Sequence, residues 1–183
     1  MADSYLFLSY QRSALTTPAV ERLSRQARVL LKSSGVDVFF DQRSIDAGAA
    51  WEPAIDAALA RTTHFLAFVS VDYWLSEQCM RELDAAVSRY ERTAAPRLLF
   101  VLADQLDPND LALDSSAAAQ QLAEGAHSAA PMRRVSSAGQ INFLGPYNDA
   151  GRLVRLAFES PALLNDQLAA LITRIKPLVR GDT

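Results

Sequence analysis

The residue in this sequence best suited to chemistry is a carboxylate, Glu82, within the helical stretch Ser70–Tyr90. At about 100° per residue, Glu82 lies on the flank of the apolar arc of that helix. The arc consists of Leu75, Cys79, Leu83, Ala86 and Tyr90. A carboxylate that faces inward either finds a partner or lines a cleft, because removing its water without replacement costs free energy. Glu82 is therefore a candidate site residue, and the structural alternative is an ion pair with Arg12, Arg81 or Arg89.

Other patterns that carry chemistry are missing from the sequence. It has no GxGxxG or GxxxxGK stretch to bind phosphate and no GxSxG elbow, and His64 and His127 lack the spacing of metal ligands. Cys79 is the single cysteine, which excludes an internal disulfide and a cysteine-based zinc site. A lone cysteine on a helix is more often a small buried residue than a nucleophile. A response-regulator receiver domain has a pair of acidic residues after its first strand. Tyr10 and Gln11 occupy those positions here, which excludes a phosphoacceptor site of that class.

The composition narrows the kinds of partner. The 183 residues are 50% hydrophobic and carry a net charge of −3, with only Lys32 and Lys176 as lysines. This balance predicts one domain and no direct binding to nucleic acid or an anionic membrane. The N-terminal stretch has no signal-peptide pattern and no apolar run is long enough to span a bilayer, so we expect a cytoplasmic protein without a membrane anchor.

Short apolar runs alternate with amphipathic helical stretches, which predicts an α/β fold. The expected strands are Tyr5–Ser9, Val36–Phe40, His64–Ser70, Arg97–Ala103 and, more weakly, Gln140–Leu144. Helices are expected from Thr17 and Pro18 (with Leu30 and Leu31 in the apolar stripe), around Pro53–Ala60, after Ser76, and from Ser160 to just before Pro177. We predict a flavodoxin-like doubly wound sheet of about five parallel strands, in the order 2-1-3-4-5, with helices on both faces. One domain would span residues 1–183, with an atypical insertion rich in Ala, Ser and Asp at about 104–139.

The predicted topology places a crevice at the carboxyl ends of the first and third strands, where the strand order reverses. The first strand ends in Ser9, Tyr10, Gln11, Arg12 and Ser13. The third ends in Ser70 and leads through Tyr73, Trp74 and Ser76 to the helix that carries Glu82. We expect these two segments to line one crevice.

Three segments, in this order and spacing, resemble the Toll/interleukin-1 receptor (TIR) domain, in particular its bacterial NAD-cleaving type. They are FLSYQRS at Phe7–Ser13, GVDVFFDQRSIDAGAAWEPAIDAAL at Gly35–Leu59, and FVSVDYWLSEQCMREL at Phe68–Leu83. TIR domains act as self-associating signalling adaptors or as enzymes that cleave NAD+ at the nicotinamide bond. In the enzymes, the catalytic glutamate follows the cysteine of this helix, so the resemblance assigns catalysis to Glu82. The aromatic residue often found before the cysteine is Gln78 here.

Polar and aromatic residues at the expected crevice are the candidates for binding the substrate around Glu82. We expect Tyr10, Gln11 and Arg12 to contact NAD+, with Arg12 at its phosphates or ribose, together with Asp41, Ser76 and Gln78. Trp51 or Trp74 would supply the stacking surface that Gln78 does not. Each of three residues has a structural alternative. Arg12 could instead form an ion pair with Glu82 or Asp41, and Trp51 could pack its loop against the sheet. Ser76 could serve only as a helix cap.

The expected activity is hydrolysis or cyclisation of NAD+, which gives nicotinamide with ADP-ribose or a cyclic isomer, in bacterial immunity against phage. NAD+ is the substrate, and neither a cofactor nor a metal is expected. The loop Asp41–Ala50 would bind other TIR copies, and activation would come from self-assembly or from a separate sensor or effector protein. The alternatives are a non-catalytic TIR scaffold and an enzyme similar to nucleoside deoxyribosyltransferases.

Overall fold

Four parallel strands form the centre of the molecule in the computed structural model, which describes residues 4–32, 35–39, 51–104 and 142–180. The strands are β1 (Ser4–Tyr10), β2 (Val36–Phe39), β3 (His64–Val69) and β4 (Arg97–Leu102). They lie in the order β2-β1-β3-β4, so the strand order reverses between β1 and β3 as the sequence predicts. β3 is buried along its whole length, as is typical of a central parallel strand.

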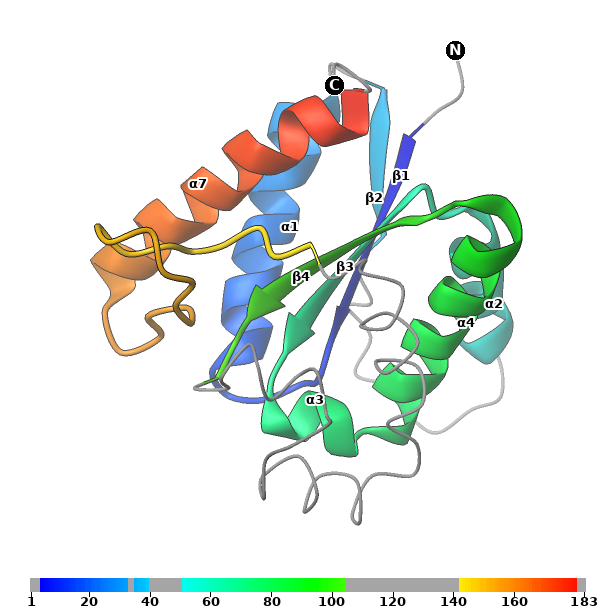
Figure 1. The fold of residues 1–183 in the computed structure, drawn as a ribbon, viewed down its shortest axis with the longest axis horizontal. Coiled ribbons are helices and arrows are strands. Elements are labelled where there is room, and N and C mark those ends of the chain that lie inside the picture. Colours follow the sequence, from blue (N-terminus) through cyan, green and yellow to red (C-terminus); the bar gives the residue numbers. More distant parts are fainter. Residues whose placement is uncertain (1–3, 33–34, 40–50, 105–141, 181–183) are drawn as a thin grey trace.

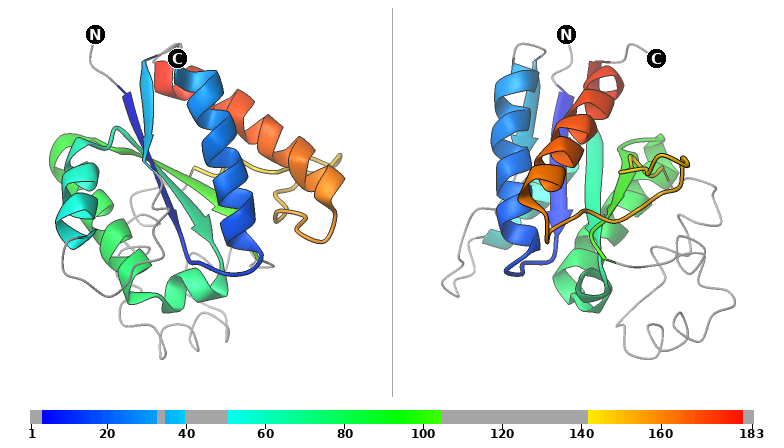
Figure 2. Two further views of the ribbon diagram at one scale, coloured as in Figure 1. Left: turned by 180° about the vertical axis from the view of Figure 1, so that it is seen from behind. Right: turned by 90° about the vertical axis from the view of Figure 1, so that its left-hand side faces the viewer.

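Helices cover both faces of this sheet (Figures 1 and 2). On one face lie α1 (Thr16–Lys32) and α7 (Pro161–Arg180), and on the other lie α2 (Trp51–Arg61) and α4 (Glu77–Thr93). Successive side chains of β1 point to opposite faces of the sheet, so they belong to two hydrophobic cores, one on each face. Leu6 and Leu8 pack with α1 and α7, whereas Phe7 packs with α2 and α4. Ser9 has the same parity as Phe7, so its hydroxyl points toward the α4 side.

The predicted fifth strand, Gln140–Leu144, is reduced to a single bridge in the part that the structure describes. Phe143 pairs in parallel with Phe100 of β4. The N–H of Phe100 donates to the Asn142 carbonyl, and the N–H of Leu144 donates to the Phe100 carbonyl, both at 2.9 Å. The pairing stops there because Gly145, at φ +102°, turns the chain and Pro146 has no N–H to continue a ladder.

Helix α1 differs in two details from its predicted form. It begins at Thr16 rather than Thr17, because the Ser13 hydroxyl accepts a hydrogen bond from the Thr16 N–H at 2.9 Å. Leu30, expected in the apolar stripe, is 50% exposed, whereas Leu31 is fully buried. Leu31 continues the four-residue spacing of Leu23 and Ala27, and Leu30 lies about 100° away from it around the helix.

The stretch Ser70–Tyr90 is not one helix but two. Ser70 caps a short helix, α3 (Val71–Leu75), by accepting from the N–H of Tyr73. Ser76 ends α3 and caps α4 by accepting from the N–H of Cys79, which confirms its predicted role as a cap. Leu75 therefore does not belong to the apolar arc of α4, and it is 47% exposed.

Helix α7 runs through Pro177, where the sequence predicts its end. Proline removes one backbone donor from a helix, but tertiary contacts hold the turn that follows it. The Ser4 hydroxyl donates to the Val179 carbonyl at 2.7 Å, and His64 Nε2 donates to the Leu178 carbonyl at 3.1 Å. Val179 is buried in the core, so packing outweighs the missing bond.

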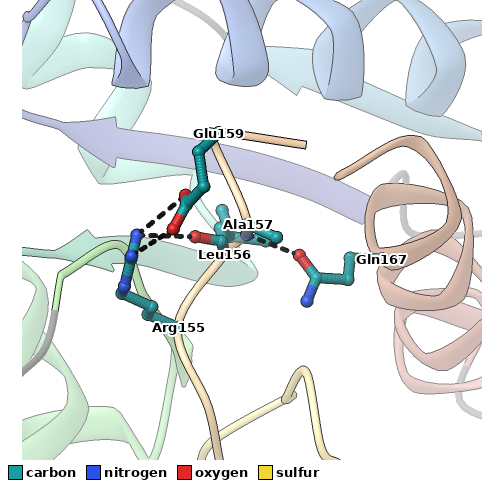
Figure 3. A network of polar contacts seen from close by, with 5 residues as sticks. All are labelled: Arg155, Leu156, Ala157, Glu159 and Gln167. Atoms are coloured by element: carbon teal, nitrogen blue, oxygen red, sulfur yellow. Dashed lines mark hydrogen bonds and ion pairs between the residues drawn. The ribbon is translucent and has the colours of Figure 1, made fainter. Parts of the chain in front are cut away.

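The connection from β4 to α7 is tied to the body of the molecule by side-chain contacts (Figure 3). Arg155 forms an ion pair with Glu159 within this connection. The Gln167 side chain on α7 accepts a hydrogen bond from the N–H of Ala157 at 2.8 Å. The bond to Gln167 holds the segment just before α7 against that helix, and the ion pair lies within this segment.

We expect the stability of the protein to fall as the pH is lowered below about 6.5, the ordinary value for histidine, because of His64. Burial lowers the pKa of His64, and the nearby Arg97 charge lowers it further, although the bond to the Leu178 carbonyl acts in the opposite direction. The unfolded chain therefore takes up this proton at a higher pH than the folded chain. The contribution of neutral His64 is present above the unfolded pKa and is lost as the pH falls toward the folded one.

Thermal unfolding measured between pH 5 and 7.5 checks this expectation. His64→Gln should show a flatter dependence on pH than the wild type, whereas His127→Gln, at the other histidine of the chain, serves as the matched control. Equal slopes in the wild type and His64→Gln would show that His64 is not the titrating group.

Candidate active site

A pocket lies at the carboxyl end of β1, between this strand, α2 and the start of α4. Its volume is about 260 Å³. Six of the nine predicted site residues line it: Tyr10, Gln11, Arg12, Ser76, Gln78 and Glu82. The remaining walls are Phe7, Leu8, Ile55 and Cys79, so the pocket combines apolar surface with a few polar groups. This composition is typical of a small-molecule site.

Glu82 is held from two sides. Its side chain projects from α4, and the residue is only 9% exposed. The Ser9 hydroxyl on β1 donates to Oε2 at 2.7 Å, and the Gln78 amide, one helical turn earlier, donates to Oε1 at 3.1 Å. Both of these donors are neutral side chains.

Two of the arginines weighed as partners of Glu82 make other contacts. Arg89 donates to the backbone carbonyls of Leu59 and Thr62, at the end of α2. Arg81 forms an ion pair with Asp56, at 3.9 Å. Arg12 is exposed and lines the pocket, where a guanidinium is suited to bind phosphate.

Ser9 and Tyr73 lie in the two segments expected to meet at the crevice, and they support Glu82 although neither was predicted to bind substrate or to act in catalysis. The Tyr73 hydroxyl lies 3.0 Å from Ser9 Oγ, and each of the two residues is 1% exposed. The sequence contains one signal that could have identified Ser9: it is a serine in a buried strand, directly after the apolar residues Phe7 and Leu8. The contact to Tyr73 depends on the turn of α3, which the sequence pattern does not resolve.

Trp74, another of the predicted site residues, does not line this pocket. Trp74 is 1% exposed and packs in the core between the sheet and α4, so it has no free face on which nicotinamide could stack. A tryptophan on a five-residue helix pressed against the sheet buries more apolar area in the core than at a crevice rim. Trp51 is the first residue of α2, but its side chain lies outside the described part of the structure, as does all of Asp41.

Cys79 forms part of the wall and is not an activated nucleophile. Burial, together with the neighbouring Glu82 charge, raises the pKa of Cys79 to about 12. The thiol is therefore protonated at neutral pH, and its Sγ donates a weak hydrogen bond to Gln11 Oε1 at 3.7 Å.

Two further properties concern the described residues alone. Among them, no three side chains of His, Cys, Asp or Glu come together in a way that could hold a metal ion. None of the helices in the same residues has the length and apolar character needed to cross a membrane.

A parallel α/β sheet in the order 2-1-3-4, with a buried glutamate in a pocket where the order reverses, defines a flavodoxin-like domain with a candidate site at that pocket. The family model for the TIR domain matches residues 6–134, and the chain belongs to this family. The TIR domains in a structure of the activated Roq1 resistosome, which directly recognizes the pathogen effector XopQ, share the fold with a TM-score of 0.57. The identity is 14%, over 94% of this chain and 96% of that chain. No curated protein sequence matches the chain.

Proposed function

We propose that this TIR domain is an enzyme that cleaves NAD+ at the bond between nicotinamide and ribose. The observation that carries the proposal is the placement of Glu82, a buried carboxylate that lines a pocket and accepts hydrogen bonds from the neutral donors Ser9 and Gln78. A domain that served only as a scaffold would have no use for such a group, since burying a carboxylate costs free energy. The six lining residues with polar side chains are among the nine that the sequence predicts for the site.

One carboxylate is enough for this reaction. A glycosidase acting on an ordinary sugar needs a second carboxyl group to protonate its leaving alkoxide. In NAD+, the leaving nicotinamide is cationic, takes the electron pair of the broken C–N bond and departs as a neutral molecule. Glu82 would stabilise the positive charge that grows on the ribose ring, and the low polarity of the Phe7 and Ile55 walls would strengthen that attraction.

The attacking group then determines the product. Water at the ribose carbon gives ADP-ribose and releases a proton, whereas a nitrogen of adenine or a ribose hydroxyl of the same molecule gives a cyclic isomer. Both routes use the same first step and the same role for Glu82.

The pocket is suited to part of NAD+ and not to the whole molecule. Its volume of about 260 Å³ lies below the range of roughly 300 to 1,000 Å³ that is usual for small-molecule sites. We propose that nicotinamide and its ribose occupy it next to Glu82, with the phosphates toward Arg12. The adenosine half would extend beyond the residues that line this pocket.

The setting we propose for this activity is immunity in the bacterial cytoplasm, with assembly of several TIR copies as the trigger. The relative named above is part of an activated resistosome, in which TIR domains are assembled. A sensor or effector protein could bring copies of this chain together in the same manner. The loop at 41–50, expected to form the contact, lies outside the described residues.

The test is incubation of the purified protein with NAD+ at high protein concentration, followed by chromatographic separation of nicotinamide, ADP-ribose and cyclic products. Release of nicotinamide supports the proposal, and the second product distinguishes hydrolysis from cyclisation. Turnover of deoxynucleosides without NAD+ cleavage would instead indicate the deoxyribosyltransferase alternative. Inertness toward both, in a protein that self-associates, would indicate a scaffold.

A further inference from the structure

Tyr73, Ser9 and Glu82 form a chain of hydrogen bonds whose direction is fixed by chemistry. Ser9 has one hydroxyl proton, which it donates to Glu82 Oε2 at 2.7 Å. Ser9 Oγ must therefore accept in its second contact, so the Tyr73 hydroxyl donates to it at 3.0 Å. The chain runs from Tyr73 through Ser9 to the carboxylate.

We propose that Tyr73 and Ser9 are positioning residues that hold Glu82 in its ionised form and in one orientation; this inference rests on the proposed function of Glu82. Hydrogen bonds to the charged form of a carboxyl group favour that form, and donors linked in a chain polarise one another. Burial acts in the opposite direction, because it favours the neutral acid. The two hydroxyls thus counter the effect of the apolar walls on the group that must be negative during the reaction.

The surrounding structure fixes both donors. Ser9 is on the central strand β1, and its side chain is enclosed between the sheet and α4. Tyr73 is on α3, and its N–H donates to the Ser70 hydroxyl at 3.0 Å, which sets the turn that directs the ring. Burial, together with the nearby Cys79 and Glu82, raises the pKa of Tyr73 well above its ordinary value, so the phenol remains a donor.

The hydrogen bonds from Ser9 and Gln78 reach different oxygens of the carboxylate. A carboxylate offers about four sites for accepting hydrogen bonds over its two oxygens. Ser9 and Gln78 each use one of them, on different oxygens. The carboxylate is therefore held at both oxygens beside the pocket that it lines.

The experiment compares Tyr73→Phe and Ser9→Ala with the wild type in two measurements. The first is the titration of the Glu82 carboxyl carbon by NMR in protein with labelled glutamate, with the resonance assigned by its loss in Glu82→Gln. The second is the dependence of kcat for NAD+ cleavage on pH. Tyr90→Phe, which removes a phenolic hydroxyl from α4 at a residue outside the pocket, is the matched control.

We expect Ser9→Ala to move the Glu82 titration and the acid limb of kcat to higher pH, by about tenfold in proton concentration, the scale of one hydrogen bond to a charged group. Tyr73→Phe should move both in the same direction by less, and Tyr90→Phe should move neither. Titrations of Glu82 that coincide in the wild type and both variants would overturn the proposal, as would a shift to lower pH. The NMR titration needs no turnover, so it tests the two hydroxyls even if NAD+ is not cleaved, whereas absence of cleavage alone would count against the proposed function.

Discussion

Replacement of Glu82 by Gln should lower NAD+ cleavage by at least about a hundredfold and leave the fold intact. The amide has nearly the size of the carboxyl group and its oxygen can still accept a hydrogen bond from Ser9, but it lacks the charge that stabilises the ribose cation. The measurement is the rate of nicotinamide release at saturating NAD+, alongside circular dichroism and thermal unfolding to establish folding. Glu82→Ala should lose activity equally.

The matched control is Glu77→Gln, because Glu77 is an exposed carboxylate in the first turn of the same helix and does not line the pocket. Its activity should stay close to that of the wild type. Near-wild-type turnover by Glu82→Gln would show that Glu82 is not the catalytic group. Loss of folding in both Glu82 variants would mean that the carboxylate supports the core.

The second large effect should come from assembly: specific activity should rise steeply as the protein concentration is raised. We propose that the pocket on one copy holds only part of NAD+, so that a neighbouring copy supplies the missing wall. If the loop at 41–50 of one copy contacts the Glu82 pocket of the next, the contact is head-to-tail, and a contact of this kind that does not close gives an open filament. The measurement is specific activity over a wide dilution series, with light scattering on the same samples.

Two substitutions in that loop sharpen the assembly test. Replacing Gly48 or Ile45 should lower activity at concentrations where the wild type assembles, without affecting the residues that do the chemistry. Activity strictly proportional to protein, from a species that stays monomeric throughout, would contradict the assembly model and leave a site complete in one copy.

The sequence predicts the sheet well because each strand is a short apolar run whose burial is decided locally. It predicts the pocket for a related reason: the carboxyl ends of neighbouring parallel strands must meet, so Tyr10, Gln11 and Arg12 lie beside the start of α4 once the topology is known. Glu82 is identified by its position on the flank of an apolar arc. These inferences need the spacing of residues and no knowledge of tertiary contacts.

The features that differ from expectation depend on contacts between distant segments. Helix α7 continues past Pro177 because Ser4 and His64 bond to the carbonyls of Val179 and Leu178. Trp74 is in the core because α3 forms a separate turn, whose two ends depend on the serine caps Ser70 and Ser76. Pattern and propensity within a single segment contain no information on such partners.

The hydrogen bond between Ser4 and Val179 has a practical consequence for attaching other molecules. It joins the amino end of β1 to the last turn of α7, so both lie at the end of the sheet where β1 begins (Figure 1). The pocket lies at the other end, where β1 finishes. β1 has seven residues, so the two ends of this strand are separated by roughly 20 Å at about 3.3 Å per residue. A fluorophore, affinity handle or surface tether joined near either of these two positions would therefore leave the entrance to the pocket open to substrate.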